Sequence, residues 1–133
     1  MPANGSSFQV SLVREFPYAL GLMAIMMGCN DMSFVAVVKF PCKPGQAQAL
    51  EDLFHSALAD TRDFQGCERI DVVFNEGSNT YLLVEYWDHE ASYDRYLQWR
   101  TDTGIADALA PIIEGGWEGI LASVYRLGNI QKI

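Results

Sequence analysis

The sequence predicts an α+β domain with the ferredoxin-like order βαββαβ and an antiparallel sheet. An alternating apolar run at 34–40 comes first, and a long helical pattern follows it. Two further strand patterns, at 67–75 and 80–87, are separated only by turn-forming residues, which is typical of an antiparallel hairpin. More helical sequence then leads to a closing strand at 122–127.

The strand at 34–40 has apolar side chains on both of its faces. Such a strand must be covered twice, by helices on one face and by something else on the other. In a sheet of about four strands, the most economical second cover is another copy of the same chain. We therefore expect a homodimer, with Val35, Val37 and Leu83 forming an apolar patch on the face opposite the helices.

The helices have recognisable ends. Pro44-Gly45 precedes the first helix and Gln65-Gly66 ends it. Asp88 is the expected N-cap of the second helix, which should restart near Gly104 and end at Gly115-Gly116. Both helices carry a stripe with spacings of three and four residues. The stripes are Ala47, Leu50, Phe54, Ala57, Leu58, Thr61 and Phe64 in the first, and Tyr93, Tyr96, Leu97 and Arg100 in the second.

Composition excludes several classes of protein. The 133 residues suffice for one domain, and the formal net charge of −8 argues against nucleic acid or anionic membranes as partners. The three cysteines are odd in number and lack CxxC spacing, which favours a reduced, cytoplasmic location over a disulfide framework. The two histidines have no carboxylate at metal-ligand spacing, so no metal site is expected.

Residues 1–32 differ from the domain that we expect at 33–133. The segment Phe16–Cys29 carries no charge over fourteen residues, which is too short to cross a bilayer. Three interpretations stay open: an arm packed on the domain or its partner, a cleavable segment, or an upstream start codon with Met32 as the natural beginning. The arm is the preferred one.

Four short segments, in order and spacing, resemble the antibiotic biosynthesis monooxygenase family. They are Phe34–Phe40, Lys43-Pro44-Gly45, Gln65-Gly66-Cys67 and Leu83–Trp87, and the similarity extends over residues 33–127. The resemblance implies homodimers of ferredoxin-like subunits whose two sheets form a dimeric α+β barrel. Some members oxidise phenolic or quinol substrates with molecular oxygen and no cofactor, others degrade haem, and many have no assigned activity.

The chain also departs from this family. Tyr96 stands where many members have a histidine, so a histidine base at that place is excluded. The haem-degrading branch has an Asn, a Trp and a His at positions that align with Val38, Tyr96 and Ala106, so haem degradation is not expected. The sequence has no flavin fingerprint and no Gly-rich phosphate loop, and we expect no cofactor.

Cofactor-free oxygenation requires the protein to bind a phenol or enol, remove its proton and exclude water. Glu85 lies in an apolar strand, where desolvation would raise its pKa toward that of a base; the alternative is an ion pair with Arg69, Arg95 or Arg100. Tyr96 would donate a hydrogen bond to a substrate oxygen, or pack in the core with its hydroxyl satisfied. Arg100 would hold a phenolate or carboxylate, or lie at the surface or in an ion pair.

Three aromatic residues, Trp87, Tyr93 and Trp99, are candidate walls for a planar ligand, although large aromatic side chains also fill cores and interfaces. Two hypotheses about function follow. The first is a cofactor-independent monooxygenase that oxidises a small aromatic, phenolic or quinol-like molecule. The second is a non-catalytic small-molecule-binding or interaction module on the same dimeric barrel.

Overall fold

The structure is a computed structural model that describes residues 32–133, so the predicted N-terminal arm and its alternatives lie almost wholly outside the described residues. The α+β prediction is confirmed. The elements are β2 (Phe34–Pro41), α3 (Ala47–Asp63), β3 (Cys67–Asn75), β4 (Thr80–Trp87), α4 (Glu90–Asp102), α5 (Ile105–Leu109), α6 (Gly116–Ser123) and β5 (Tyr125–Asn129). Within this part of the chain, no helix combines the length and apolar character needed to cross a membrane.

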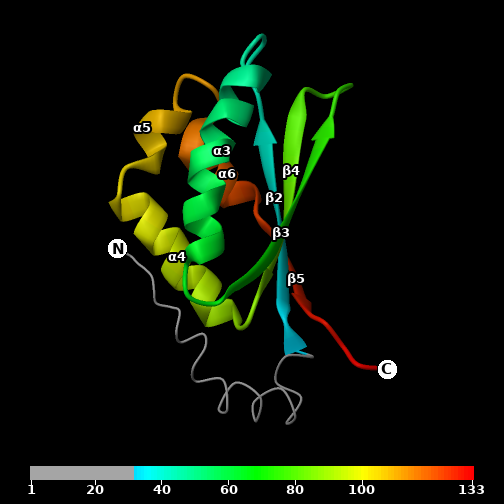
Figure 1. Cartoon of the computed structure of the whole chain (residues 1–133). Coiled ribbons are helices and arrows are strands. Elements are labelled where there is room, and N and C mark those ends of the chain that lie inside the picture. Colours follow the sequence, from blue (N-terminus) through cyan, green and yellow to red (C-terminus); the bar gives the residue numbers. More distant parts are fainter. Residues whose placement is uncertain (1–31) are drawn as a thin grey trace. The chain divides into compact units, whose positions relative to one another are not determined.

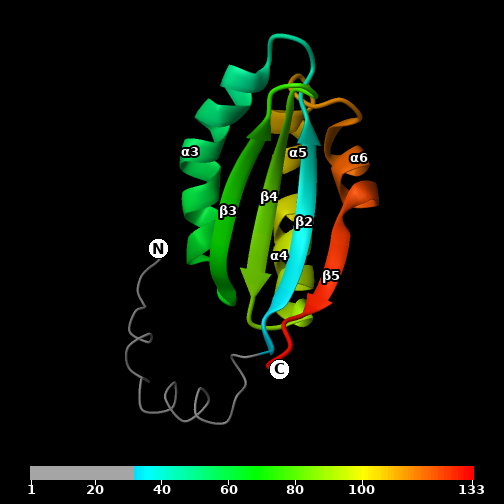
Figure 2. The same ribbon diagram turned by 90° about the vertical axis from the view of Figure 1, so that its right-hand side faces the viewer.

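The sheet has the strand order β3-β4-β2-β5, and every neighbouring pair is antiparallel. This is the ferredoxin-like order, with the first strand of the domain in the middle of the sheet (Figure 2). The helices of the described domain all lie on one face of the sheet, and its other face carries none of them (Figure 1). The helices therefore cover one face of the sheet and form the core with it, whereas no helix of the described domain covers the other face.

The core lies between the sheet and the helices and has two parts. The larger part is mainly aliphatic and joins β2, β3, β4, α3, α5 and α6. The smaller part is mainly aromatic and consists of Phe34, Ala36, Trp87, Tyr93 and Tyr96. Both parts use the alternate residues of β2 from Phe34 to Phe40, which are all buried, as the alternation predicts.

The expected patch on the opposite face contained one wrong residue. Leu83 is 2% exposed and belongs to the core beneath the helices, because it pairs with Val38 of β2. Its neighbours Leu82 and Val84 take the other face, where Val84 pairs with Val37. The error has a physical reason: residues 82–84 are all apolar, so the sequence contains no alternation there and only the pairing register decides the phase.

Two helix boundaries were also wrong. The N-cap of α4 is His89, without a side-chain cap, while the backbone N–H of Asp88 donates to the Gly66 carbonyl at 2.8 Å. Gly115 and Gly116 do not end the helical region; with φ of 81° and 61° they begin α6. The closing strand consequently starts at Tyr125 instead of residue 122, because α6 takes up the residues before it.

Gly66 marks the closest approach between the α3–β3 corner and the start of α4. Its φ is +101°, and a Cβ atom there would lie 2.5 Å from the Cβ of Ser92 and 2.7 Å from Oδ1 of Asp88. Only glycine combines this backbone conformation with so little space. The corner that begins α4, and with it the direction of that helix, depends on this residue.

We predict that Gly66→Ala lowers the free energy of unfolding by about 3 kcal/mol, because it adds backbone strain and overpacking together. Gly45→Ala is the matched control: its φ is +77°, but nothing lies within 4 Å of a Cβ there. It should cost only about 1 kcal/mol of backbone strain. Urea unfolding of the two variants measures both values, and equal losses would contradict the packing argument.

Candidate functional site

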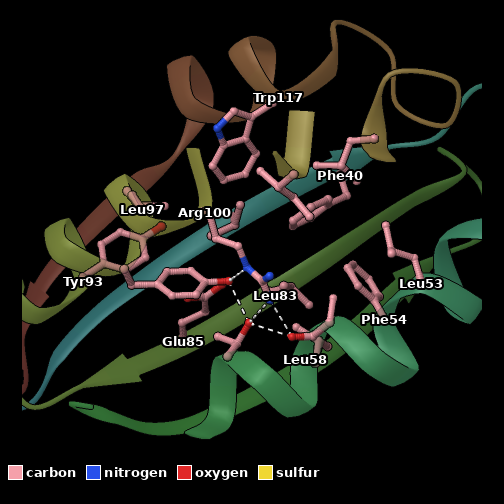
Figure 3. A pocket seen from close by; sticks show the side chains of 16 residues that line it. Phe40, Leu53, Phe54, Leu58, Leu83, Glu85, Tyr93, Leu97, Arg100 and Trp117 are labelled. Carbon is pink, nitrogen blue, oxygen red and sulfur yellow. Dashed lines mark hydrogen bonds between the residues drawn. The ribbon is translucent and has the colours of Figure 1, made fainter. Parts of the chain in front are cut away.

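A cavity of about 40 Å³ lies between the helix-bearing face of the sheet and the four helices. This volume has room for roughly three water molecules. Most of its lining is aliphatic or aromatic, and the polar lining groups come from Thr61, Glu85, Tyr93, Tyr96 and Arg100 (Figure 3). A few polar groups that converge in an apolar cavity are the usual mark of a small-molecule site.

Arg100 is the most unusual of these polar residues. It is only 8% exposed, and no carboxylate lies within salt-bridge distance of it among residues 32–133. The sequence offered two alternatives to a site role, a surface position and an ion pair, and the structure contradicts both. A buried arginine without a counter-ion is costly and is kept only where other groups hold it.

Neutral oxygens and aromatic rings hold the Arg100 guanidinium. Nε donates to the Tyr96 hydroxyl at 2.9 Å, and Nη2 donates to the Ala57 carbonyl at 2.6 Å and to Oγ1 of Thr61 at 2.9 Å. The guanidinium carbon lies 4.8 Å from the ring centre of Trp99 and 5.5 Å from that of Tyr96. Figure 3 shows the side chain reaching from α4 into the group of lining residues. Its position is therefore fixed without a carboxylate.

The hydroxyl of Tyr96 is already committed to this network. It accepts from Arg100 and lies 2.7 Å from Oγ1 of Thr61. Thr61 in turn donates to the Ala57 carbonyl at 3.1 Å, so Tyr96 is the donor in the bond between the two hydroxyls. This matches the alternative of a packed tyrosine with a satisfied hydroxyl, and burial raises the pKa of Tyr96.

Glu85 lies on β4 and is 3% exposed. Its Oε1 accepts from Nε1 of Trp87 at 3.1 Å, and no arginine of residues 32–133 is within salt-bridge distance. The proposed ion pair with Arg69, Arg95 or Arg100 is therefore wrong: Arg69 pairs with Asp71, and Arg95 donates to Ser92. Burial raises the pKa of Glu85 to about 7, although the Trp87 bond and the more distant Arg100 charge lower it in part.

The carboxyl group of Glu85 has one side-chain hydrogen bond in the described part of the chain, from Trp87 to Oε1, and none is seen at Oε2. The hydroxyl of Tyr93, a residue with 0% exposure, is buried and has no hydrogen-bond partner among residues 32–133. Burial raises the pKa of Tyr93, and the nearby Glu85 charge raises it further. Buried polar atoms without partners are rare and point to a missing water or ligand.

The structure brings four of the six predicted site residues to the cavity: Glu85, Tyr93, Tyr96 and Arg100. The other two, Trp87 and Trp99, do not line it. Trp87 is fully buried behind Glu85 and contacts the rings of Phe64, Tyr93 and Tyr96. Trp99 lies against the guanidinium of Arg100. Both shape the site through the charged groups that they contact.

Sequence reasoning missed Thr61 and Trp117 as lining residues. Thr61 did carry a signal, because it is the polar member of an otherwise apolar helical stripe. Trp117 carried none, because its helix was not predicted; its Nε1 donates to Oγ1 of Thr101 at 3.0 Å and ties α6 to α4. No group of three His, Cys, Asp or Glu side chains in residues 32–133 is arranged to hold a metal ion.

Comparisons with known proteins agree with this fold. The family model for antibiotic biosynthesis monooxygenase matches residues 33–101, just over half of the chain. No curated protein matches the sequence. A solved structure from Methanosarcina mazei is 20% identical with a TM-score of 0.57, and covers 66% of this chain and 88% of its own. One from Pseudomonas aeruginosa is 20% identical with a TM-score of 0.51, and covers 73% and 96%. A proposed antibiotic biosynthesis monooxygenase from Chloroflexus aurantiacus is 18% identical with a TM-score of 0.53, and covers 76% and 96%.

The raised pKa of Glu85 makes stability depend on pH. The folded protein keeps the Glu85 proton up to about pH 7, whereas the ordinary pKa of the unfolded chain is 4.5. Between pH 4.5 and about 7 the unfolded state therefore binds fewer protons than the folded state. The free energy of unfolding falls by about 3 kcal/mol as the pH rises through this range. We expect urea unfolding at several pH values to show this loss in the wild type and not in Glu85→Gln. Parallel curves for the two proteins would contradict the assignment.

Proposed function

The chain belongs to the antibiotic biosynthesis monooxygenase family, and we propose that it is a cofactor-independent monooxygenase acting on a small phenolic or quinol-like molecule. One observation carries the proposal: a buried carboxyl group, Glu85, and a buried guanidinium, Arg100, line the same apolar cavity, and neither has an ion-pair partner among residues 32–133. The first can accept a proton near neutral pH, and the second can hold the anion that remains.

The reaction begins with a proton transfer. The O–H bond of the phenol breaks, Glu85 takes the proton on its free Oε2, and Arg100 holds the phenolate. The electron-rich phenolate then gives electrons to molecular oxygen, and a C–O bond forms at a ring carbon. The O–O bond breaks as water leaves with the hydrogen of that ring carbon and the proton held by Glu85, so that one phenol and one O₂ give one quinone and one water and Glu85 is free again. The apolar walls exclude solvent during these steps.

The remaining polar residues position the two charged groups. Tyr96 and Thr61 hold the guanidinium of Arg100, and Trp87 orients the carboxyl of Glu85. Tyr93 has a hydroxyl free to donate to a substrate oxygen. In this proposal Tyr96 is a positioning residue, because donation to a substrate would break its bond to Thr61.

We predict oxygen uptake when the protein meets its substrate among a panel of hydroquinones, naphthols and anthrones in metal-free buffer. Glu85→Gln should lower kcat by about 100-fold or more, because the proton acceptor is lost. Glu76→Gln, on the exposed hairpin turn, is the matched control and should leave the rate unchanged. An oxygen electrode measures the rates, and background consumption with the whole panel would count against the proposal.

A non-catalytic binding module is the second candidate, and the tyrosine at position 96, where many family members have a histidine, favours it. A space of about 40 Å³ is smaller than a one-ring phenol requires, so a ligand enters only if side chains move. A binder gains thermal stability from its ligand by mass action, without product. Thermal shift combined with product detection on the same panel separates the candidates: stabilisation without quinone supports the module, and quinone formation rejects it.

We also propose that the protein is a homodimer whose two sheets pack face to face. The sheet face without helices carries apolar side chains that include Val37, Val73, Leu82 and Val84. Val73 is 48% exposed, and Tyr125, on the same face of β5, is 65% exposed. Soluble monomers seldom leave such a patch uncovered, and members of this family are typically dimeric. An obligate interface of this kind buries on the order of 2,000 Å².

We predict that Val37→Asp dissociates or unfolds the protein, because it places an unpaired carboxylate in the centre of each sheet, at a cost of about 3 kcal/mol or more per subunit. Ala59→Asp adds the same charge on an exposed position of α3 and should leave the dimer intact. Asp94 on α4 is also exposed, but Asp94→Ala is unsuitable as a control because the Asp94 carboxylate pairs with Arg126 at 2.9 Å. Light scattering at micromolar concentration gives the mass, and a wild-type value near 14.8 kDa would reject the dimer.

We also propose that the domain begins at residue 33 and that the protein is cytoplasmic. The family model begins at residue 33, where the domain was expected to start. Cys42 and Cys67 are free thiols, as a reduced compartment would leave them. Burial raises the pKa of the Cys67 thiol to about 12, so this residue is a poor nucleophile.

A further inference from the structure

We infer that the cavity binds a small inorganic anion, of the size of chloride, against Arg100 and takes it up together with a proton on Glu85. The inference goes beyond the proposed function and does not depend on it, because a binding module would hold the same anion as an oxygenase. It rests on the free hydrogen-bond donors of the cavity wall, on the charge of the wall and on the size of the cavity.

Apart from Glu85, the polar groups that are free in the cavity wall are hydrogen-bond donors. The guanidinium of Arg100 has five N–H groups, and the protein uses three of them, on Nε and Nη2. No hydrogen bond from Nη1 is seen in the described chain, and the Tyr93 hydroxyl has no partner there either. The hydroxyls of Tyr96 and Thr61 are bonded to each other and to Arg100. A ligand that fits this wall must therefore accept hydrogen bonds.

The cavity also holds an unbalanced positive charge whenever Glu85 is protonated. Arg100 is 8% exposed, has no ion-pair partner among residues 32–133, and donates its hydrogen bonds to neutral oxygens. A buried charge is costly unless an opposite charge lies close to it. Water in the cavity could accept from Nη1 but would leave the charge unbalanced, whereas an anion supplies both the acceptor and the charge.

The protonation of Glu85 decides when this anion binds. The ionised carboxylate faces the same cavity as Arg100, balances its charge and repels a second anion. The protonated carboxyl is neutral, and its O–H is a further donor to an anion. Burial raises the pKa of Glu85 to about 7, so this change occurs near neutral pH. The anion and the proton therefore bind together and leave together.

No other group that faces Glu85 takes over its proton. Trp87 of β4 donates to Oε1, and burial raises the pKa of both Tyr93 and Tyr96 of α4, so these hydroxyls stay neutral. On β3, burial raises the pKa of the Cys67 thiol to about 12, with a smaller rise from the Glu85 charge. The cavity-lining residues of β2, α3, α5 and α6 have no titratable side chain.

The size of the cavity restricts the anion to very few atoms. Its volume of about 40 Å³ has room for roughly three water molecules, and therefore for chloride, bromide or nitrite. Sulfate brings a second charge and four oxygens, which is more than one guanidinium nitrogen and one hydroxyl can satisfy in an apolar wall.

The test measures chloride binding to the full chain through the line width of the chlorine NMR signal, which broadens when a protein holds the ion. We expect broadening at acid pH that bromide and nitrite reverse by displacement and that sulfate at equal ionic strength does not. The apparent dissociation constant should rise about thirtyfold from about pH 5.5 to about pH 8.5, because one proton leaves with each anion.

Substitutions identify the site. Arg100→Met should abolish the broadening, whereas Arg95→Met, at an exposed position of the same helix, should leave it unchanged. Glu85→Gln is neutral at every pH and keeps N–H donors, so it should bind chloride equally well at both pH values. Tyr93→Phe guards against a folding defect in Arg100→Met: it removes a free donor and no hydrogen bond seen in the described chain, and should weaken chloride binding about tenfold.

No broadening by the wild type at either pH overturns the inference, and so does broadening that persists unchanged in both Arg100→Met and Tyr93→Phe. A wild-type affinity that does not change with pH, or a pH dependence that survives in Glu85→Gln, overturns it as well. Chloride binding without oxygen uptake on any phenol would keep this inference and count against the proposed function. Oxygen uptake without chloride binding would do the reverse.

Discussion

The packing of this domain depends on a buried guanidinium that has no carboxylate partner among residues 32–133. Arg100 of α4 bonds to Ala57 and Thr61 of α3 and lies against the rings of Tyr96 and Trp99. These contacts hold the two long helices at a fixed separation over the sheet. They also oppose collapse of the cavity, because a guanidinium cannot be packed against aliphatic side chains without oxygen atoms that accept its hydrogen bonds. The contacts of one side chain thus join the two helices and form part of the wall of the cavity between them and the sheet.

The carboxyl group of Glu85, which carries the opposite charge when it is ionised, lies in the sheet and not in the helix layer. Glu85 belongs to the sheet and Arg100 to the helices, and the structure keeps them apart although both face the same cavity. Had they formed an ion pair, each would have neutralised the other and the pKa of Glu85 would be low. Their separation leaves the carboxyl ready to exchange a proton and the guanidinium ready for an anion. Trp87 on one side and Tyr96 on the other maintain this arrangement.

The sequence predicted the first three strands and the shared face of the second helix well, because both depend on periodicity. The limits of β3 and β4 are as expected, and Tyr93, Tyr96 and Arg100 share a face because their spacing is helical. The failures occur where periodicity carries no information. Leu83 lies in an uninterrupted apolar run, so only strand register places it. Helix α6 begins at the glycine pair that was expected to end a helix, Gly115-Gly116. Thr61 gains its role only through contact with another helix.

The cavity's polar wall is made by the crossover helices and by the middle of a strand, and the tight hairpin at residues 76–79 takes no part in it. The usual arrangement in enzymes places specificity in loops, which can lengthen or change freely. In the proposed site, a change of substrate would require substitutions on helix faces that also carry the fold. Evolution of a new specificity on this scaffold should therefore proceed by few, coupled replacements, with stability and selectivity changing together.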